Sequence, residues 1–379
     1  MRIAMVAGEA SGDLLAAHLI EALKQRYPDA EFVGIGGPRM CAAGFVSWWP
    51  AERLAVMGYV DVLRRLPELL GIRRQLLQRL KESPPDIFIG VDAPDFNLPV
   101  ELKLRCSGVR TMHYVSPSIW AWRGHRVKGI GRAAEHVMCL FPFEPEIYRQ
   151  HGIPATFVGH PLADVFPLED QRATARELLQ LEPDQEIVAV LPGSREGEVG
   201  RLAGTYVKTM RQLAFVRPDV HFLVPLITRA TREMFEHALH AEGAGHLSVR
   251  LMFGHAHDAM AAADTVLVAS GTATLEAALL KRSMVISYKV GKMTYRLAKW
   301  LSYLPWVGLP NILAREFVVP ELLQDDATPE KLAAALLAWL EDPEARKHVA
   351  HRFEAMHLSL RQNNAEKAAA VVAGMLGRA

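Results

Sequence analysis

Short apolar runs alternate with helix-forming stretches along most of the chain, and this alternation restricts the possible folds more than any other feature. It is the pattern of a parallel β-sheet covered by helices. In the first half the expected strands are residues 2–7, 31–35, 86–91, 110–115, 136–140 and 156–158, and the expected helices are 13–27, 98–106, 123–132 and 144–151. In the second half the expected strands are residues 187–191, 221–225, 248–252, 265–269 and 285–288. The pattern therefore predicts an α/β protein.

The alternation restarts after residues 159–170, a stretch containing glycine, proline and aspartate that suits a linker. The chain has 379 residues, which is more than one ordinary domain holds. We therefore expect two Rossmann-like domains, residues 1–165 and 166–340, that face each other across a central cleft. The sequence reads as helices only from Thr328 onward, and residues 341–379 are expected to form a helical tail.

Charge and cysteine content exclude several classes of protein. The 43 basic and 42 acidic residues leave a net charge of +1, which argues against a nucleic-acid-binding protein. The three cysteines form no CxxC pair, so neither a zinc site nor a disulfide framework is expected, and a reduced cytosolic compartment fits. The apolar run at the N-terminus ends at Glu9, which indicates a buried strand rather than a signal peptide. The uncharged stretch 301–314 contains two prolines and is too short to cross a membrane.

In open parallel sheets ligands bind at the carboxyl ends of the strands, so the loops that follow strands are the places to look for chemistry. The first such loop is Gly8-Glu9-Ala10-Ser11-Gly12-Asp13. Its glycines let the backbone approach a ligand, and the helix start favours an anion or a polar sugar oxygen. The chain has neither GxGxxG in this loop nor GxxxxGK(S/T) anywhere, so the dinucleotide and P-loop fingerprints are missing. A tight turn capped by Ser11 or Asp13 is the alternative interpretation.

Two loops of the second half suit a nucleotide diphosphate. Leu191-Pro192-Gly193-Ser194-Arg195 follows a strand and offers an open backbone, a hydroxyl and a cation. Ala269-Ser270-Gly271-Thr272-Ala273-Thr274-Leu275-Glu276 joins a strand to a helix, where small hydroxylated residues can cradle a pyrophosphate. Glu276 lies one turn into that helix and can accept hydrogen bonds from a ribose. An ordinary turn with a surface arginine, or a capped helix with a buried acid, is the alternative.

Other polar residues follow strands of the first half. Asp92 comes directly after the strand 86–91 and is well placed for a general base, whereas Asp95 is expected to cap the next helix. The tryptophans of Ser116-Pro117-Ser118-Ile119-Trp120-Ala121-Trp122 line either an acceptor groove or the core. Gly159-His160-Pro161 is expected to be a hinge or a linker.

Near the last helices, the side chains of Asn311, Glu321 and Gln324 are candidates to reach a bound donor substrate. Glu196-Gly197-Glu198 has the spacing of a carboxylate pair, but at a helix start this is better interpreted as favourable first-turn charge than as a metal site. We therefore expect neither a metal ion nor an organic cofactor.

Several motifs occur in a fixed order. They are Gly8-Glu9-x-Ser11-Gly12-Asp13, Gly36-Gly37-Pro38-x-Met40, Val91-Asp92-x-Pro94-Asp95-Phe96, Ser118-x-Trp120-Ala121-Trp122, Pro142-Phe143-Glu144, Val158-Gly159-His160-Pro161, Leu191-Pro192-Gly193-Ser194-Arg195 and Ser270-Gly271-Thr272-Ala273-Thr274-Leu275-Glu276. In this order the motifs are highly specific, and the chain resembles the lipid-A-disaccharide synthases from residue 1 to about residue 325.

The resemblance implies a GT-B glycosyltransferase with the acceptor site in the N-terminal domain and the UDP site in the C-terminal domain. The family joins UDP-2,3-diacylglucosamine to 2,3-diacylglucosamine 1-phosphate, which gives a β-1,6-linked disaccharide 1-phosphate and UDP. This step belongs to lipid A and lipopolysaccharide biosynthesis in Gram-negative bacteria. The resemblance also implies a peripheral protein on the cytoplasmic face of the inner membrane. The helical tail then returns to an N-terminal domain, either its own or that of the partner in a homodimer.

The resemblance also assigns roles to residues. Asp92 is the preferred base for the acceptor 6-hydroxyl, Glu9 is the alternative base, and Arg195 stabilises the departing UDP without a metal. The expected donor-binding set is Gly193, Ser194, Arg195, Ser270, Gly271, Thr272, Ala273, Thr274, Glu276, Asn311 and Gln324. The expected acceptor-binding set is Glu9, Ser11, Asp92, Ser118 and Trp120.

Residues 53–81 mix leucines and valines with arginines and contain only two acidic residues, Asp61 and Glu68. Such a composition suits an interfacial helix on an anionic membrane surface. The alternative is a pair of core-packing helices with solvated arginines. Because diacylated sugars stay in the bilayer, we expect this stretch to face the membrane.

Two rival functions remain open. A UDP-N-acetylglucosamine 2-epimerase, or a GT-B transferase with another acceptor, shares the C-terminal cradle. A UDP-sugar sensor or membrane scaffold is the rival outside enzymes, and it binds UDP without turnover.

Overall fold

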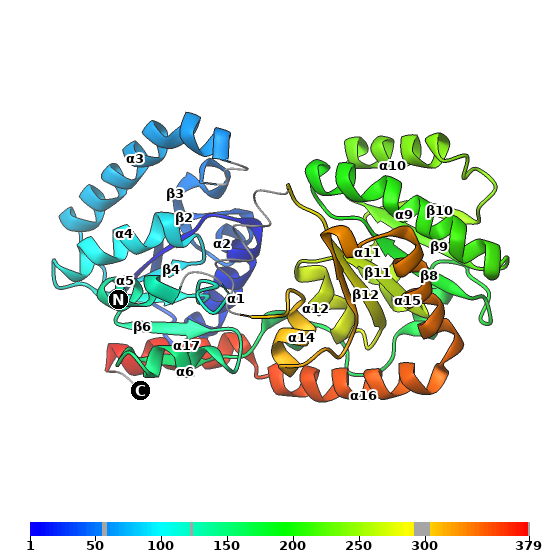
Figure 1. Ribbon diagram of the computed structural model, residues 1–379. Helices are drawn as coiled ribbons and strands as arrows, with labels where there is room; N and C mark the ends of the chain where they lie inside the picture. The colour runs from blue at the N-terminus through cyan, green and yellow to red at the C-terminus, as the bar shows by residue number, and fades with distance from the viewer. Residues whose placement is uncertain (55–58, 122–123, 292–303, 378–379) are drawn as a thin grey trace. The chain divides into compact units, whose positions relative to one another are not determined.

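The computed structural model describes residues 1–54, 59–121, 124–291 and 304–377 (Figure 1). The chain divides into two compact units, the first made of Met1–Asp164 together with Leu360–Ala379 and the second of Val165–Ser359. Each unit contains an open parallel sheet with helices packed on it, so the expected α/β fold class is confirmed.

The first unit contains a seven-stranded sheet with the order β3-β2-β1-β4-β5-β6-β7. Its strands are β1 (Arg2–Ala7), β2 (Glu31–Gly36), β3 (Val46–Pro50), β4 (Ile87–Val91), β5 (Arg110–Tyr114), β6 (His136–Cys139) and β7 (Ala155–Phe157). All the pairs are parallel, and β1 pairs with β2 on one side and β4 on the other. The central strands are buried on both faces, which explains their continuous apolar sequences.

Helices cover both faces of this sheet. They are α1 (Ala10–Arg26), α2 (Pro38–Ala42), α3 (Tyr59–Glu82), α4 (Pro94–Arg105), α5 (Val127–Ala133), α6 (Glu144–Arg149) and α17 (Asn364–Leu376), with 3-10 turns η1 (Ala51–Arg53) and η2 (Gly124–Arg126). Alternate residues of β1 separate the two faces. Met5 packs in one core cluster with residues of α1 and α17, whereas Val6 packs in another with residues of α3 and α4. A short helix, α7 (Pro161–Val165), ends at the boundary between the units.

The second unit contains a six-stranded parallel sheet with the order β10-β9-β8-β11-β12-β13. Its strands are β8 (Ile187–Leu191), β9 (His221–Leu226), β10 (Val249–Phe253), β11 (Thr265–Ala269), β12 (Ser283–Tyr288) and β13 (Glu321–Leu323). Its helices are α8 (Arg172–Leu178), α9 (Glu196–Val216), α10 (Arg229–Ala241), α11 (Ala256–Ala262), α12 (Thr272–Leu279), α14 (Leu309–Ala314), α15 (Pro329–Glu341) and α16 (Pro343–Leu360), with a 3-10 turn η3 (Gln324–Asp326).

Every strand that the sequence predicts is present, with ends that shift by one or two residues. The structure adds β3 and β13, which are the outer strands of the two sheets. Helices α1 and α4 begin earlier than expected, at Ala10 and at Pro94.

The last helix, α17, is part of the first unit. Asn364 connects it to that unit, because its side chain accepts a hydrogen bond from the Tyr114 hydroxyl (2.5 Å) and donates one to the Gly159 carbonyl (2.9 Å). The Asp164 carboxylate accepts from the backbone N–H groups of Asn363 (2.9 Å) and Asn364 (2.6 Å). These bonds fix the start of α17 at the point where the chain leaves and re-enters the first unit.

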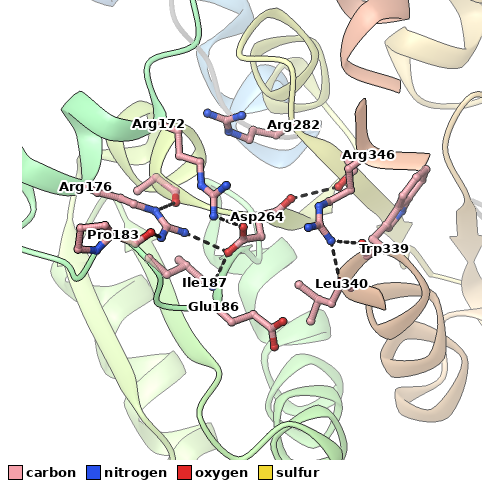
Figure 2. A network of polar contacts seen from close by, with 12 residues as sticks. Arg172, Arg176, Pro183, Glu186, Ile187, Asp264, Arg282, Trp339, Leu340 and Arg346 are labelled. Atoms are coloured by element: carbon pink, nitrogen blue, oxygen red, sulfur yellow. Dashed lines mark hydrogen bonds and ion pairs between the residues drawn. The ribbon is translucent and has the colours of Figure 1, made fainter. Parts of the chain in front are cut away.

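A network of buried charges lies at the amino-terminal edge of the second sheet (Figure 2). Asp264, directly before β11, accepts hydrogen bonds from Arg172, from Arg176 (3.0 Å) and from the backbone N–H of Ile187 at the start of β8 (2.8 Å). The side chains of Asp264 and Arg176 are only 7% and 4% exposed. Arg176 also donates to the carbonyl of Pro183. Because ligands bind at the carboxyl ends of parallel strands, at the opposite edge, we assign this network a structural role.

Candidate functional site

The order of the strands reverses once in each sheet. The reversal lies between β1 and β4 in the first sheet and between β8 and β11 in the second. Open α/β sheets bind their ligands beside such reversals, at the carboxyl ends of the strands. Glu9 and Asp92 follow β1 and β4, whereas Arg195 and Ser270–Thr274 follow β8 and β11. The residues that the sequence singles out therefore flank the reversal in both sheets.

The loops after β1 and β4 lie against each other. A Cβ atom at Gly8 would lie 3.1 Å from the Cβ atom of Ala93, so the two loops leave little room for a side chain at this position. The side chains of Glu9 and Ser11 are exposed, and that of Asp92 is half-buried. The first unit thus brings its two candidate bases onto adjacent loops.

The backbone after β4 and after β5 is held in an unfavourable conformation. Asp92, Ala93 and Val115 have φ angles of +52°, +41° and +78°, a region that non-glycine residues avoid and β-branched residues avoid most. The Asn97 side chain holds the first of these turns, because it donates to the carbonyls of Val6 (3.2 Å) and Asp92 (2.8 Å). Strained backbone held by specific hydrogen bonds is typical of functional sites. Here it fixes the position of Asp92.

Two aspartates have partners other than those expected. Asp13 does not cap its own helix: its buried carboxylate accepts from three backbone N–H groups of Gly37–Met40, at 2.8, 3.0 and 3.1 Å. Ser11 does not cap α1 either, since that helix has no side-chain cap. Asp95 lies inside the first turn of α4 and forms an ion pair with Arg126. These two carboxylates therefore stabilise loops next to the site.

Trp120, after β5, lies beside a buried carboxyl group. Its indole N–H donates to Glu144 Oε1 (3.1 Å), and the backbone N–H of Phe141 donates to Glu144 Oε2 (2.9 Å). The rings of Phe141 and Phe143 meet the indole in T-shaped contacts, with centroids 6.3 and 5.5 Å away. Burial raises the pKa of Glu144 to about 7. Trp120 is half-exposed and Ser118 is exposed, so both can contact a ligand.

His160 extends this aromatic cluster towards the end of the first unit. Its ring stacks on Phe141 at a centroid distance of 5.5 Å, and its backbone N–H donates to the carbonyl of Leu360 (2.9 Å). Burial lowers the pKa of His160 to about 4, so the imidazole is neutral at physiological pH. A neutral ring agrees with Nδ1 accepting from the N–H of Leu162 (3.3 Å).

The loop after β8 is closed by a glutamate of the following helix. Glu198 Oε2 accepts from the backbone N–H groups of Ser194 (3.1 Å) and Arg195 (3.3 Å). Gly193 has a φ angle of +120°, and a Cβ atom there would lie 2.6 Å from that of Glu198. The side chains of Ser194 and Arg195 are exposed. The Arg195 guanidinium is therefore presented to solvent by a loop that Glu198 holds in shape.

Helix α12 begins immediately after β11, with Gly271 as its N-cap. The first N–H groups of a helix have no partner within it, so this helix start presents donors and a positive dipole end to a ligand. Gly271 and Thr272 are exposed and Ala273 is half-buried. The Thr274 hydroxyl points inward and donates to the carbonyl of Gly271 (2.8 Å). The Ser270 hydroxyl donates to a backbone carbonyl as well, at 3.5 Å.

Glu276, one turn into α12, faces His257 of α11 at 3.4 Å. The hydrogen bond to Glu276 raises the pKa of His257. Glu276 is partly exposed, so a carboxylate oxygen is available to a polar ligand on that side.

The side chains of Asn311 and Gln324 form hydrogen bonds with other groups of the protein. Asn311 is fully buried: its amide donates to Val319 (2.9 Å) and Glu321 (2.8 Å), and its oxygen accepts from two backbone N–H groups, at 2.8 and 3.1 Å. These four hydrogen bonds occupy both donors and both acceptor positions of the Asn311 amide. The Gln324 amide pairs with the backbone N–H and carbonyl of Val290, at 2.9 and 3.1 Å. We therefore assign both side chains a supporting role, in place of the direct donor contact that their positions suggested.

Glu321 connects Asn311 to the loop before α14. Its carboxylate accepts from the backbone N–H groups of Val307 and Gly308, both at 2.9 Å. The candidate donor side of the second unit is thus reinforced by a buried hydrogen-bond network.

Sequence reasoning missed the roles of three polar side chains, those of Asn97, Glu144 and Glu198. Each stands in the first two turns of a helix that directly follows a strand, and this place in the chain is the signal that could have found them. Among the residues that the structure describes, no group of three or more His, Cys, Asp or Glu side chains is arranged to hold a metal ion.

Helix α3 shows which apolar residues of 53–81 are available to a membrane. The expectation is wrong for four of them, because they pack into the core: Ile72, Leu76, Leu77 and Leu80. Leu66 and Leu70 are 42% and 45% exposed. Val56 and Met57 lie outside the described residues, as do the side chains of residues 59–64.

A groove of about 580 Å³ runs along the exposed side of α3. Its lining is mostly basic, with one acidic and one amide side chain and two leucines: Arg73, Arg74, Lys81, Lys103, Glu82, Gln78, Leu70 and Leu77. None of the described helices is long and apolar enough to span a bilayer.

Comparison with known proteins identifies the family of the chain. The model of the Lipid-A-disaccharide synthetase family matches residues 3–374. The Lipid-A-disaccharide synthase of Aromatoleum aromaticum is 63% identical over 377 residues, covering 100% of this chain and 96% of the relative. That of Pseudomonas aeruginosa (strain UCBPP-PA14) is 50% identical over 378 residues, covering 100% of this chain and 99% of the relative.

Solved structures share the fold at low sequence identity. UDP-GlcNAc 2-epimerase from Neisseria meningitidis, bound to UDP-GlcNAc, aligns with a TM-score of 0.66 and 12% identity over 100% of both chains. MurG from Acinetobacter baumannii aligns with a TM-score of 0.58 and 16% identity over 99% of both chains. These likenesses show the GT-B fold, and the sequence matches decide the function within it. The chain belongs to the lipid-A-disaccharide synthase family and is a GT-B glycosyltransferase of lipid A biosynthesis.

Proposed function

We propose that this enzyme transfers the sugar of UDP-2,3-diacylglucosamine to the 6-hydroxyl of 2,3-diacylglucosamine 1-phosphate, with inversion at C1. The observation that carries the proposal is the arrangement of polar groups around the strand-order reversal of each sheet, with carboxylates in the first unit and cationic or dipolar groups in the second. The names of the relatives support the disaccharide product. The neighbour bound to UDP-GlcNAc supports a UDP-sugar donor.

In the proposed reaction the acceptor oxygen attacks C1 of the donor while the bond between C1 and the phosphate oxygen of UDP breaks. The proton of the hydroxyl passes to Asp92, and UDP leaves with the bonding electrons, so an α-linked donor gives a β-linked product. Asp92 is preferred to Glu9 as the base. Its backbone is fixed by Asn97 and its side chain is half-buried, whereas Glu9 is exposed. Glu9 stays the alternative.

We assign the diphosphate of the donor to the Arg195 guanidinium and the start of α12. The Glu198 carboxylate already accepts from the N–H groups of the loop after β8, so that backbone is not the anion site. Negative charge grows on the leaving phosphate as the bond breaks, and a fixed cation with a helix dipole stabilises it. Glu276 is placed to accept from the ribose.

The decisive experiment supplies radiolabelled UDP-2,3-diacylglucosamine with and without the 1-phosphate acceptor. Formation of both a labelled disaccharide and UDP, dependent on the acceptor, is the expected result. Conversion of a UDP-sugar without any acceptor would identify an epimerase instead. Binding of UDP without turnover would identify a sensor or scaffold.

We expect Arg195→Ala to lower kcat by roughly 10²–10³, the usual cost of removing one preorganised charge stabiliser. The fold should be intact, because the Arg195 side chain is exposed. Arg201→Ala is the matched control, since that arginine lies in α9, directly after the loop of Arg195, and bonds only to the Gly197 carbonyl among the described residues (2.7 Å). If Arg195→Ala has near-normal turnover, the assignment of Arg195 to the diphosphate is wrong.

Glu276→Ala should mainly weaken UDP binding, measured by calorimetry, because Glu276 is assigned to the ribose.

We also propose that the enzyme binds an anionic membrane surface through the exposed side of α3. Leu66 and Leu70 supply apolar area, and the basic residues of the adjacent groove attract lipid phosphates. Both substrates carry acyl chains, and each buried CH₂ contributes about 0.8 kcal/mol to membrane partitioning, so the enzyme must work at the bilayer.

The double variant Leu66→Ser/Leu70→Ser is expected to bind anionic vesicles several-fold more weakly in a flotation assay, with unchanged UDP affinity. Raised salt should weaken binding of the parent as well, because it screens the arginines. Leu102→Ser is the matched control, since Leu102 is 41% exposed on α4 of the same unit. If the double variant binds vesicles as tightly as the parent, the docking surface lies elsewhere.

A further inference from the structure

We infer that Trp120 is a stacking platform for the acceptor sugar and that Glu144 is the positioning residue that orients it, through a hydrogen bond from the indole N–H that is strongest when the carboxylate is ionised. The inference rests on the acceptor site proposed above. It adds a second residue, buried and out of contact with substrate, that controls acceptor affinity.

The platform is built from the loops after β5 and β6. Trp120 is half-exposed, and its ring plane is set by perpendicular contacts with Phe141 and Phe143, at interplanar angles of 87° and 88°. Neither phenyl ring lies parallel on the indole, so part of the ring is open. The apolar C–H face of a sugar packs on an aromatic ring of this kind. Because these loops lie at the carboxyl edge of the sheet, on the side of Asp92, the platform is on the acceptor side.

Glu144 is the group that fixes the angle of the indole. It is 2% exposed, and its two oxygens accept from the Trp120 indole and from the Phe141 backbone at 3.1 and 2.9 Å. Burying a carboxyl group is costly unless donors compensate it, and here donors from two loops converge on one group. A core that needed only apolar packing would not need this carboxyl group.

Of the described titratable groups in this cluster, Glu144 is the one that changes its charge near neutral pH. Burial raises the pKa values of the Cys139 thiol and the Tyr148 hydroxyl far above neutrality, and it lowers the pKa of His160 to about 4. Glu146 of α6 is paired with Arg149 at the surface (2.7 Å). None of these described groups changes its charge between pH 6 and 8, whereas the pKa of Glu144 is about 7.

The direction of the effect follows from the donors around Glu144. Above pH 7 the carboxylate accepts both N–H bonds. Below pH 7 one oxygen carries a proton and accepts a hydrogen bond only weakly, so one of the two N–H bonds is weakened. The indole is the partner that can rotate away, because the other donor is backbone. Acceptor affinity should therefore fall as the pH decreases through 7.

The test measures the KM for the 1-phosphate acceptor between pH 6 and 8, at saturating donor. In the parent this KM is expected to rise on the order of tenfold between pH 8 and pH 6, as the ionised fraction of a group titrating near 7 falls. Glu144→Gln and Trp120→Phe should have a raised acceptor KM that does not show this rise between pH 8 and pH 6. Their donor KM should be unchanged and their kcat should change by less than a few-fold. The phosphate of the acceptor titrates near pH 6, and it does so equally with every variant. Dividing the acceptor KM of each variant by that of the parent at the same pH therefore removes this contribution.

Trp339→Phe is the matched control, because its indole donates to the uncharged carbonyl of Met284 (3.1 Å) in the second unit. Its acceptor KM should follow the parent at every pH. A Glu144→Gln enzyme that keeps the parental pH dependence of acceptor KM would overturn the inference. If Glu144→Gln fails to fold, Trp120→Phe decides, and a parental pH profile there overturns it equally. A parent that makes no disaccharide would instead refute the proposed function.

Discussion

Asp92→Asn is expected to lower kcat by roughly 10²–10⁴, the usual contribution of a general base, while the affinity for the UDP donor stays unchanged. Asparagine keeps the size of the side chain but cannot accept the proton of the acceptor hydroxyl. The Asn97 bond that holds the turn goes to the backbone carbonyl of residue 92, so the substitution leaves it in place. Steady-state kinetics with both substrates and calorimetry with UDP make the measurement.

Asp95→Asn is the control for Asp92→Asn, since Asp95 is exposed in the same loop region and pairs with Arg126. It should retain near-parental kcat. Glu9→Gln separates the two candidate bases. An active Asp92→Asn enzyme together with an inactive Glu9→Gln enzyme would reverse the roles proposed for these two residues.

Asp264→Asn is expected to destabilise the second unit by about 3–5 kcal/mol, because it leaves buried Arg176 without its anionic partner. For a unit of this size the loss corresponds to a decrease in melting temperature on the order of 10 °C. The network lies at the amino-terminal edge of the sheet, away from the loops after β8 and β11. UDP affinity measured well below the melting temperature should therefore be preserved.

Glu186→Gln is the control for Asp264→Asn. Glu186 is adjacent to Ile187 and forms a two-bond ion pair with Arg217 (2.6 and 3.0 Å), but both side chains are partly exposed. Such pairs contribute only about 0–1 kcal/mol. Equal melting temperatures of the two variants in differential scanning calorimetry would show that burial of the Asp264 network does not contribute as proposed.

The sequence predicts the strands of this fold well for a physical reason. Strands buried on both faces must be apolar throughout, and such runs are visible without a structure. The strand β3 was missed because all of its residues are half-buried or exposed, so its sequence mixes Ser47 and Pro50 with two tryptophans. The strand β13 has three residues, too few to form a pattern.

The helix α3 could have been interpreted more closely. Ile72, Leu76 and Leu80 follow the four-residue spacing that places side chains on one helix face, and this is the face that packs in the core. Leu66 and Leu70 fall on a different face. Periodicity thus separates Ile72, Leu76 and Leu80 from Leu66 and Leu70, but it does not identify Leu77, which lies two turns after Leu70 and packs in the core.

For the site, the sequence identifies loops but not side-chain partners. Glycines and hydroxyl groups after a strand indicate where a ligand can bind, and in the structure Arg195 and Ser270–Thr274 follow β8 and β11 at the carboxyl edge. Which side chains face each other depends on loops that are distant in the chain. The partners of Asp13, the Trp120–Glu144 bond and the inward direction of Asn311 are all of this kind, and no local spacing encodes them.

The first unit is discontinuous in sequence, and this affects how the protein is made. Synthesis proceeds from the N-terminus, and N-terminal domains ordinarily fold first. Here Ala368, Ala369 and Val372 of α17 belong to the same core cluster as Leu19 of α1. Until α17 has been synthesised, the part of that apolar face which it covers stays exposed. A nascent chain that still lacks α17 therefore exposes apolar surface that chaperones and proteases recognise, and only molecules that contain α17 acquire a finished first unit.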